Sequence, residues 1–223
     1  MRSYTITCNN SNVILEIFLC LELSSNNKKE LLKNIKQAFR KCSPFIIEKV
    51  TVLIFSTDDK FVIRKMNGIA GFSNMKNLII LNIHPTKGWQ KALRETFIHE
   101  IAHVLTPKYH SKIITLRDYL VFDGLAEHFR EHFLGGRKAV WVKSISEKQA
   151  ILIFNKIKKY LDSKSDDLYR KLFFGTGKYP LWAGYAIGYY VVEKYLKKQG
   201  KLNWKSLFRT PTRTIIKGFY NKN

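Results

Sequence analysis

The segment TFIHEIAHVL, residues 96–105, constrains this chain more than any other part of its sequence. His99 and His103 are four residues apart, and an α-helix places such residues on one face, about one turn apart. Most of the neighbouring residues are apolar, as in a helix that packs on several sides. A fold that contains this segment must therefore bury a helix carrying two imidazoles and, at Glu100, a carboxylate.

These three side chains predict a hydrolytic Zn²⁺ site. Imidazoles at this spacing can grip one zinc ion, and Glu100 points roughly 100° around the helix from His99. From there a carboxylate reaches a metal-bound water without being a ligand. The alternative is a core helix whose histidines are satisfied by hydrogen bonds. We expect a functional site with Glu100 as the general base.

A third protein ligand is expected, because catalytic zinc usually has three and keeps one position open for water. His110 suggests the longer motif H-E-x-x-H-x-x-G-x-x-H, but residue 106 is threonine and His110 comes one residue late. In FDGLAEHF, Asp123 and Glu127 share a helical face one turn apart. One carboxylate could bind zinc while the other orients a ligating histidine; a solvated helix edge is the alternative.

A rival motif overlaps this segment. HFREH fits the inverted pattern H-x-x-E-H, with His128, Glu131 and His132. It lacks an obvious downstream partner, since Glu147 is close and Glu193 lies in a strongly aromatic segment. We therefore prefer the site built on HEIAH.

The order of the elements predicts an α+β fold. Strand signals occur at 4–8, 13–23, 45–56 and 77–85, with a helix at 24–42 and a glycine-containing connection at 67–73. Helical spacing, caps and stop signals predict later helices at 88–105, 116–136, 146–161 and 180–200. At 223 residues we expect one domain, with a mixed α/β lobe at 1–86 and a mainly helical lobe at 87–223.

Charge and cysteine content suggest partners and a compartment. Thirty-nine Lys and Arg against 17 Asp and Glu give a net charge of +22, which favours anionic partners such as nucleic acid. The basic residues are spread along the chain, so nucleic acid rests on net charge alone. Three cysteines without a C-x-x-C pair favour a reducing compartment, and we expect a cytoplasmic protein. The apolar runs at 13–23 and 181–192 are too short to span a bilayer.

Three segments in this order, HEIAHVL, DGLAEHF and PLWAGYAIGYYVVEKYL, resemble a bacterial family of predicted zinc-dependent proteases, long catalogued as a domain of unknown function, in the gluzincin-like group of zincins. The resemblance covers more than half of the chain, roughly 77–201. It implies a zincin-like fold, with the active-site helix at the cleft between a sheet-containing lobe and a helical lobe. It also implies a peptide or protein substrate.

By this resemblance His99, His103 and Asp123 bind zinc, Glu100 is the base and Glu127 is an outer partner of the site. The family usually has glutamate where this chain has Asp123, and aspartate is one methylene shorter. Either the helices approach more closely, or Glu127 becomes the ligand, or the site is weakened.

The resemblance also suggests roles for a strand and for two tyrosines. Residues 78–83 would lie at the cleft edge and pair with an extended peptide; an ordinary strand is the alternative. Tyr185 and Tyr189 share a helical face, and a phenol aimed at the metal could stabilise an oxyanion. The sequence does not choose between the tyrosines, and an aromatic stripe at this spacing is also typical of a core.

The sequence therefore predicts a zinc metallopeptidase. The alternative is a non-catalytic zincin-fold protein whose basic surface binds nucleic acid or an acidic partner.

Overall fold

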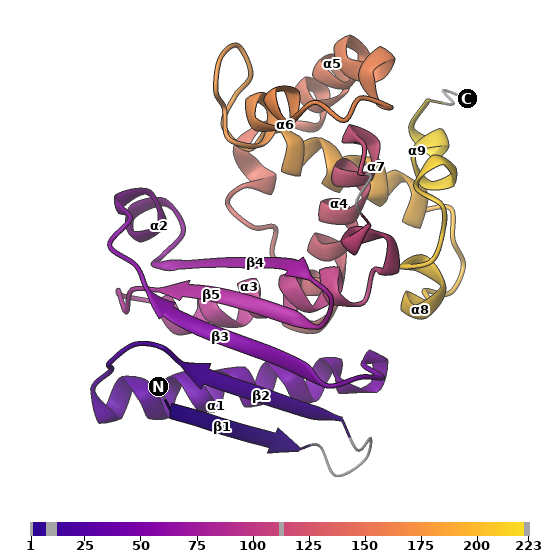
Figure 1. Ribbon diagram of the computed structural model, residues 1–223. Coiled ribbons are helices and arrows are strands. Elements are labelled where there is room, and N and C mark those ends of the chain that lie inside the picture. Colours follow the sequence, from indigo (N-terminus) through magenta and orange to yellow (C-terminus); the bar gives the residue numbers. More distant parts are fainter. Residues whose placement is uncertain (1, 8–12, 112–113, 221–223) are drawn as a thin grey trace. The chain divides into compact units, whose positions relative to one another are not determined.

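The computed structural model describes residues 2–7, 13–111 and 114–220, with the side chains of residues 74 and 220 left aside. It divides into two compact units, Met1–Leu105 and Thr106–Asn223. The first contains the sheet, and the second is helical (Figure 1). The α+β prediction is confirmed, whereas the grouping of the whole chain into one domain stays a prediction.

The first unit is built on a five-stranded mixed sheet with the order β1-β2-β3-β5-β4. The three inner strands are parallel, and the two edge strands pair antiparallel with their neighbours. The strands are β1 (Arg2–Thr7), β2 (Ile14–Leu19), β3 (Val50–Ser56), β4 (Ile69–Met75) and β5 (Leu78–Ile83).

Two long helices, α1 (Ser25–Cys42) and α3 (Trp89–Val104), lie on one face of this sheet and pack against each other (Figure 1). Burial alternates along the inner strands, as expected for a sheet with one covered face. Leu15, Val52 and Leu81 are fully buried in this core. The short helix α2 (Lys60–Lys65) precedes β4.

The second unit is centred on the packing of α4 (Leu116–Leu134) against α7 (Ala183–Leu196). Their backbones touch: a Cβ added to Gly188 would lie 2.1 Å from the carbonyl oxygen of Leu120, and one added to Gly124 would lie 2.3 Å from the carbonyl oxygen of Gly188. Only glycine fits at either position. The other helices are α5 (Glu147–Ile157), α6 (Asp166–Phe173), α8 (Trp204–Leu207) and α9 (Thr212–Tyr220).

Most predicted elements are confirmed. The strands β1 and β2 are antiparallel, as a hairpin requires, but its turn lies outside the described residues. Two predictions were wrong: β3 begins only at Val50, and the expected connection at 67–73 contains most of β4. Within the described residues, no helix is both long and apolar enough to cross a membrane.

Candidate metal centre

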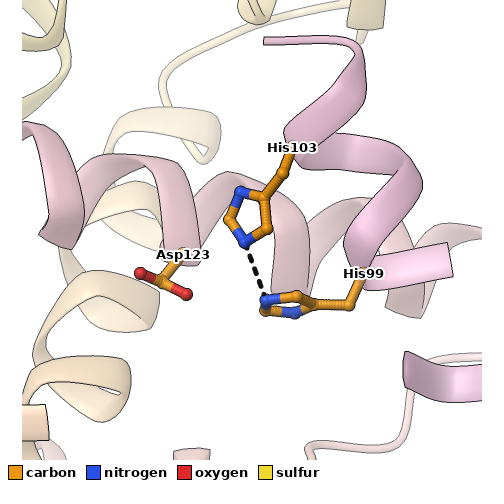
Figure 2. A group of neighbouring side chains, drawn as sticks. All are labelled: His99, His103 and Asp123. Carbon is orange, nitrogen blue, oxygen red and sulfur yellow. Dashed lines mark hydrogen bonds between the residues drawn. The ribbon is translucent and has the colours of Figure 1, made fainter. Parts of the chain in front are cut away.

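The two histidines of HEIAH lie on α3 with their ring nitrogens turned toward each other (Figure 2). The Nε2 atoms of His99 and His103 are 3.0 Å apart, and both side chains are buried. The rings meet edge to face, with centroids 4.7 Å apart. This arrangement brings two imidazole nitrogen atoms to one point, as the ligand atoms of a shared metal ion would be.

The surroundings of α3 hold this geometry. The helix begins after Gly88, whose φ of 84° is a left-handed conformation that suits glycine, and Pro107 follows its end. Leu93, Phe97 and Ile101 are fully buried. The helix is therefore packed on several sides, and its histidines have little freedom to turn away.

Glu100 is also buried, and the backbone of β4 runs directly beside it. A Cβ added to Gly71 would lie 2.6 Å from Cγ and 2.8 Å from Oε1 of Glu100, and 2.6 Å from Cγ2 of Thr96. The sheet edge next to Glu100 is thus β4. The prediction that residues 78–83 form a peptide-pairing edge was wrong, because β5 lies between β3 and β4.

In the second unit α4 carries both candidate carboxylates. The helix begins with a capping box formed by Thr115 and Asp118. Asp123 and Glu127 are both buried. Glu127 accepts a hydrogen bond on Oε1 from Nε1 of Trp141 at 2.8 Å, and one on Oε2 from Nε of Arg130 at 3.0 Å.

Arg130 belongs to the same buried network. Its side chain is only 1% exposed, and its Nη2 donates to the carbonyl oxygen of Arg137 at 2.8 Å and lies 3.5 Å from Glu131 Oε1. The guanidinium therefore ties Glu127 to the segment that follows α4. Glu127 is fixed in place by charge-assisted hydrogen bonds on both of its oxygens.

The inverted motif has a structural role around Tyr189. The Tyr189 hydroxyl donates to Glu131 Oε2 at 3.0 Å, and its ring stacks on His128 at a centroid distance of 4.2 Å. His128 Nε2 is 3.1 Å from the carbonyl oxygen of Tyr189. Burial, followed by the charge of Glu131, raises the pKa of Tyr189, and burial lowers the pKa of His128.

Tyr185 has a different environment from Tyr189. Its ring contacts those of Phe173 and Trp141, at centroid distances of 4.9 Å and 6.4 Å. It is thus held among aromatic side chains, one of which, Trp141, also donates a hydrogen bond to Glu127.

His99, His103 and Asp123 form a group that could hold a metal ion. Each offers one ligand atom, and these atoms lie within 4.8 Å of one another (Figure 2). No other group of three or more His, Cys, Asp or Glu side chains meets this description among the residues that the structure describes. His110 lies in a short 3-10 helix, Pro107–His110, and belongs to no such group.

Three residues around these side chains were not identified from the sequence. Gly71 sits in what looked like a connection, Arg130 lies within the inverted motif but is not one of its named residues, and Trp141 is an isolated aromatic residue after a double glycine. A buried tryptophan usually finds an acceptor for its N–H, which was the one available signal. Its partner, 14 residues away, is a tertiary contact.

Comparison with known proteins gives two relatives from Bacillus subtilis (strain 168), both described as uncharacterized proteins. YjaZ is 35% identical over 104 residues, covering 44% of this chain and 40% of YjaZ. YjfC is 26% identical over 203 residues, covering 81% of this chain and 67% of YjfC. The matched region thus spans less than half of YjaZ and about two thirds of YjfC.

Among solved structures, an aminopeptidase N family protein from Idiomarina loihiensis is similar, with a TM-score of 0.56 and 13% sequence identity. The match covers 96% of this chain and 42% of that protein. At this identity the likeness concerns the fold, and the predicted zincin-like fold is confirmed.

A family model described as "Predicted Zn-dependent protease (DUF2268)" matches residues 31–217. This agrees with the resemblance seen in the three ordered motifs. Because the match extends over most of the sequence, the chain belongs to the DUF2268 family of predicted Zn-dependent proteases.

Proposed function

We propose that this chain is a zinc-dependent peptidase in which His99, His103 and Asp123 bind the metal and Glu100 is the general base. The observation that carries the proposal is the convergence of two buried imidazole nitrogens, with a carboxylate oxygen within 4.8 Å. The family description and the fold of an aminopeptidase N family protein support a peptidase.

The donor set suits zinc. Tetrahedral zinc with Zn–N bonds of about 2.0–2.1 Å places two ligand nitrogens roughly 3.3 Å apart. The Nε2 atoms of His99 and His103 are 3.0 Å apart, so a small rotation of either ring would accommodate the ion. Two imidazoles and one carboxylate match the donors of catalytic sites that leave one position open.

The contacts of Glu127 favour a supporting role over a ligand role. Both of its oxygens accept hydrogen bonds, one from Trp141 and one from Arg130. Turning this carboxylate toward a metal would leave the buried Arg130 guanidinium without that charge partner, which is costly in a protein interior. Asp123 is therefore our choice for the third ligand despite its shorter side chain.

When bound, zinc would polarise the scissile carbonyl and lower the pKa of a coordinated water. The protein groups would carry the proton. Glu100 would accept it from the attacking water and later deliver it to the leaving amine, which departs as the peptide bond breaks. The backbone of β4 at Gly71 packs against the Glu100 side chain and would keep its carboxylate oriented toward the substrate.

For the oxyanion we favour Tyr185 over Tyr189. The Tyr189 hydroxyl already donates to Glu131, and its ring is held by stacking on His128. Using it at the metal would require breaking this hydrogen bond. Tyr185, one turn earlier on α7, would supply a hydrogen bond to the developing negative charge.

We further propose that an extended peptide substrate pairs with β4, the described sheet edge beside the general base. An edge strand presents backbone N–H and C=O groups that recognise a peptide with little dependence on its sequence. This role replaces the one expected for residues 78–83.

A Gly71→Ala variant tests the link between β4 and catalysis. The new methyl group would overlap Glu100 and Thr96 and displace the carboxylate. We expect kcat to fall by about tenfold to a hundredfold, as misplacement of a catalytic group by ~1 Å can do, while zinc content is unchanged. The matched control is Gly200→Ala, where an added Cβ meets nothing within 4 Å. Wild-type kcat in folded Gly71→Ala protein would contradict this role.

The proposed activity is tested by purifying the chain without a metal-affinity tag, measuring its metals, and screening a peptide library by mass spectrometry. We expect about one zinc per chain, as a single site requires, and cleavage that a chelator abolishes and added Zn²⁺ restores. A chain that takes up no zinc, or a zinc-loaded chain that cleaves no peptide in a broad library, would count against a peptidase.

A further inference from the structure

The second unit contains a cavity of about 990 Å³ beside the first turns of α4 and α9. We call it the basic cavity, because five cationic side chains line it: Lys108, Arg117, Lys164, Arg209 and Arg213. Only two carboxylates, Asp118 and Asp162, share the lining. The proposed peptidase chemistry uses none of these residues.

One of the two carboxylates is fully engaged. Asp118 accepts hydrogen bonds from the buried Thr212 hydroxyl and from Lys108 Nζ, the latter at 2.9 Å. It also accepts from the backbone N–H and the hydroxyl of Thr115. Burial would raise the pKa of Asp118, but the hydrogen bonds from Thr212, Lys108 and Thr115 hold it below its ordinary value. Asp118 therefore stays ionised and neutralises Lys108.

The other carboxylate, Asp162, is shared by two guanidinium groups. Asp162 contacts the guanidinium of Arg117 and lies 3.6 Å from Nη2 of Arg213. Lys164 and Arg209 form no ion pair within the part of the chain that the structure describes. Nε of Arg117 is buried and lacks a hydrogen-bond partner there. The cavity lining therefore carries a surplus of positive charge, since two carboxylates face five cationic side chains.

Other features of the cavity lining also favour the binding of an anion. Both α4 and α9 begin at this cavity, and helix N-termini carry partial positive charge. A neighbouring hollow of about 500 Å³ shares Arg209 and Thr210 with it and adds Lys205. Phe122 and Phe208 contribute an apolar wall.

We propose that the basic cavity binds a small molecule through an oligophosphate group. A volume near 1,000 Å³ is at the upper end for small-ligand sites, and guanidinium groups match phosphate oxygens bidentately. Five cations against two carboxylates leave a surplus of three positive charges around this space, which suits a ligand with several negative charges on neighbouring atoms. A peptide carries at most one carboxylate per side chain, so it reaches a lower charge density in the same volume.

Calorimetric titration of the whole chain with tripolyphosphate, ATP and adenosine tests this proposal. We expect saturable binding of one tripolyphosphate, and a Lys164→Glu/Arg209→Glu variant should weaken it at least about tenfold, since charge-assisted hydrogen bonds to phosphate are lost. The control, Lys148→Glu/Lys156→Glu, changes net charge equally at exposed positions of α5 away from the cavity and should weaken binding less than about threefold.

The ligands distinguish the source of the phosphate. Tighter binding of ATP than of tripolyphosphate, with none of adenosine, would indicate a nucleotide, and equal binding would indicate a free oligophosphate. Equal weakening in both double variants would show attraction by net charge alone and overturn the site. A polyglutamate peptide or an RNA oligonucleotide that binds while tripolyphosphate does not would also overturn it.

Discussion

A Glu100→Gln variant should keep its zinc and lose nearly all peptidase activity. The amide is nearly isosteric with the carboxylate, so it fits the same buried space beside Gly71, but it cannot accept a proton from water. We expect kcat to fall about 10²–10⁴-fold, the usual contribution of a positioned general base. The measurements are kcat on a peptide taken from the library screen and zinc content by elemental analysis of the same preparation.

The matched control is Glu95→Gln, which makes the same chemical change earlier on α3. Glu95 lies more than one turn before Glu100, and its side chain is 18% exposed next to Lys91. It should retain wild-type kcat. A folded, zinc-loaded Glu100→Gln protein with more than a small fraction of wild-type activity would remove Glu100 from the mechanism and leave the metal site intact as a separate question.

Loss of a metal ligand should have an equally large effect on zinc binding. His103→Ala and Asp123→Ala each remove one of three proposed protein ligands, and two ligands hold zinc poorly. We expect zinc affinity to fall by more than the about 10–100-fold that loss of an outer partner costs. Competition with a chromophoric chelator measures this affinity, and His132→Ala, at an exposed position of α4, serves as the control.

A Glu127→Gln variant tests which of the two carboxylates, Asp123 or Glu127, is the third zinc ligand. The amide oxygen can still accept from Trp141, but the charge that pairs with Arg130 is removed. We therefore expect zinc to remain bound with an affinity reduced at most about 100-fold. The free energy of unfolding should fall, because the buried guanidinium loses the nearer of its two carboxylate partners. If Glu127→Gln loses zinc while Asp123→Ala keeps it, the assignment of the third ligand is reversed.

Regular elements with strong local signals could be predicted from the sequence. The helix expected at 88–105 is α3, and the capping box that Ser146 and Gln149 form at the start of α5 reflects side-chain bonds within a few residues. The strand β4 was missed because Gly71 and Ser73 are weak strand formers. Its glycine is explained by the close approach of Glu100 and Thr96 from α3, which no local pattern reveals.

The candidate site likewise has one part that the sequence predicts and another part that depends on tertiary packing. HEIAH is a local pattern, and the spacing alone predicts the facing imidazoles of α3. The roles of Glu127 and of the two tyrosines depend on Trp141, Arg130 and Glu131, whose side-chain directions follow from tertiary packing. The predicted nucleic-acid partner likewise stays a prediction from net charge.

The backbone contact between α4 and α7 limits how the second unit can adapt to a ligand. Because a carbonyl oxygen occupies the space where each glycine would carry a Cβ, neither helix can slide or roll past the other without a clash. Asp123 on α4 and Tyr185 on α7 thus belong to one rigid helix pair and must move together. Any adjustment of the second unit to a ligand would then have to come from the segments that connect these helices.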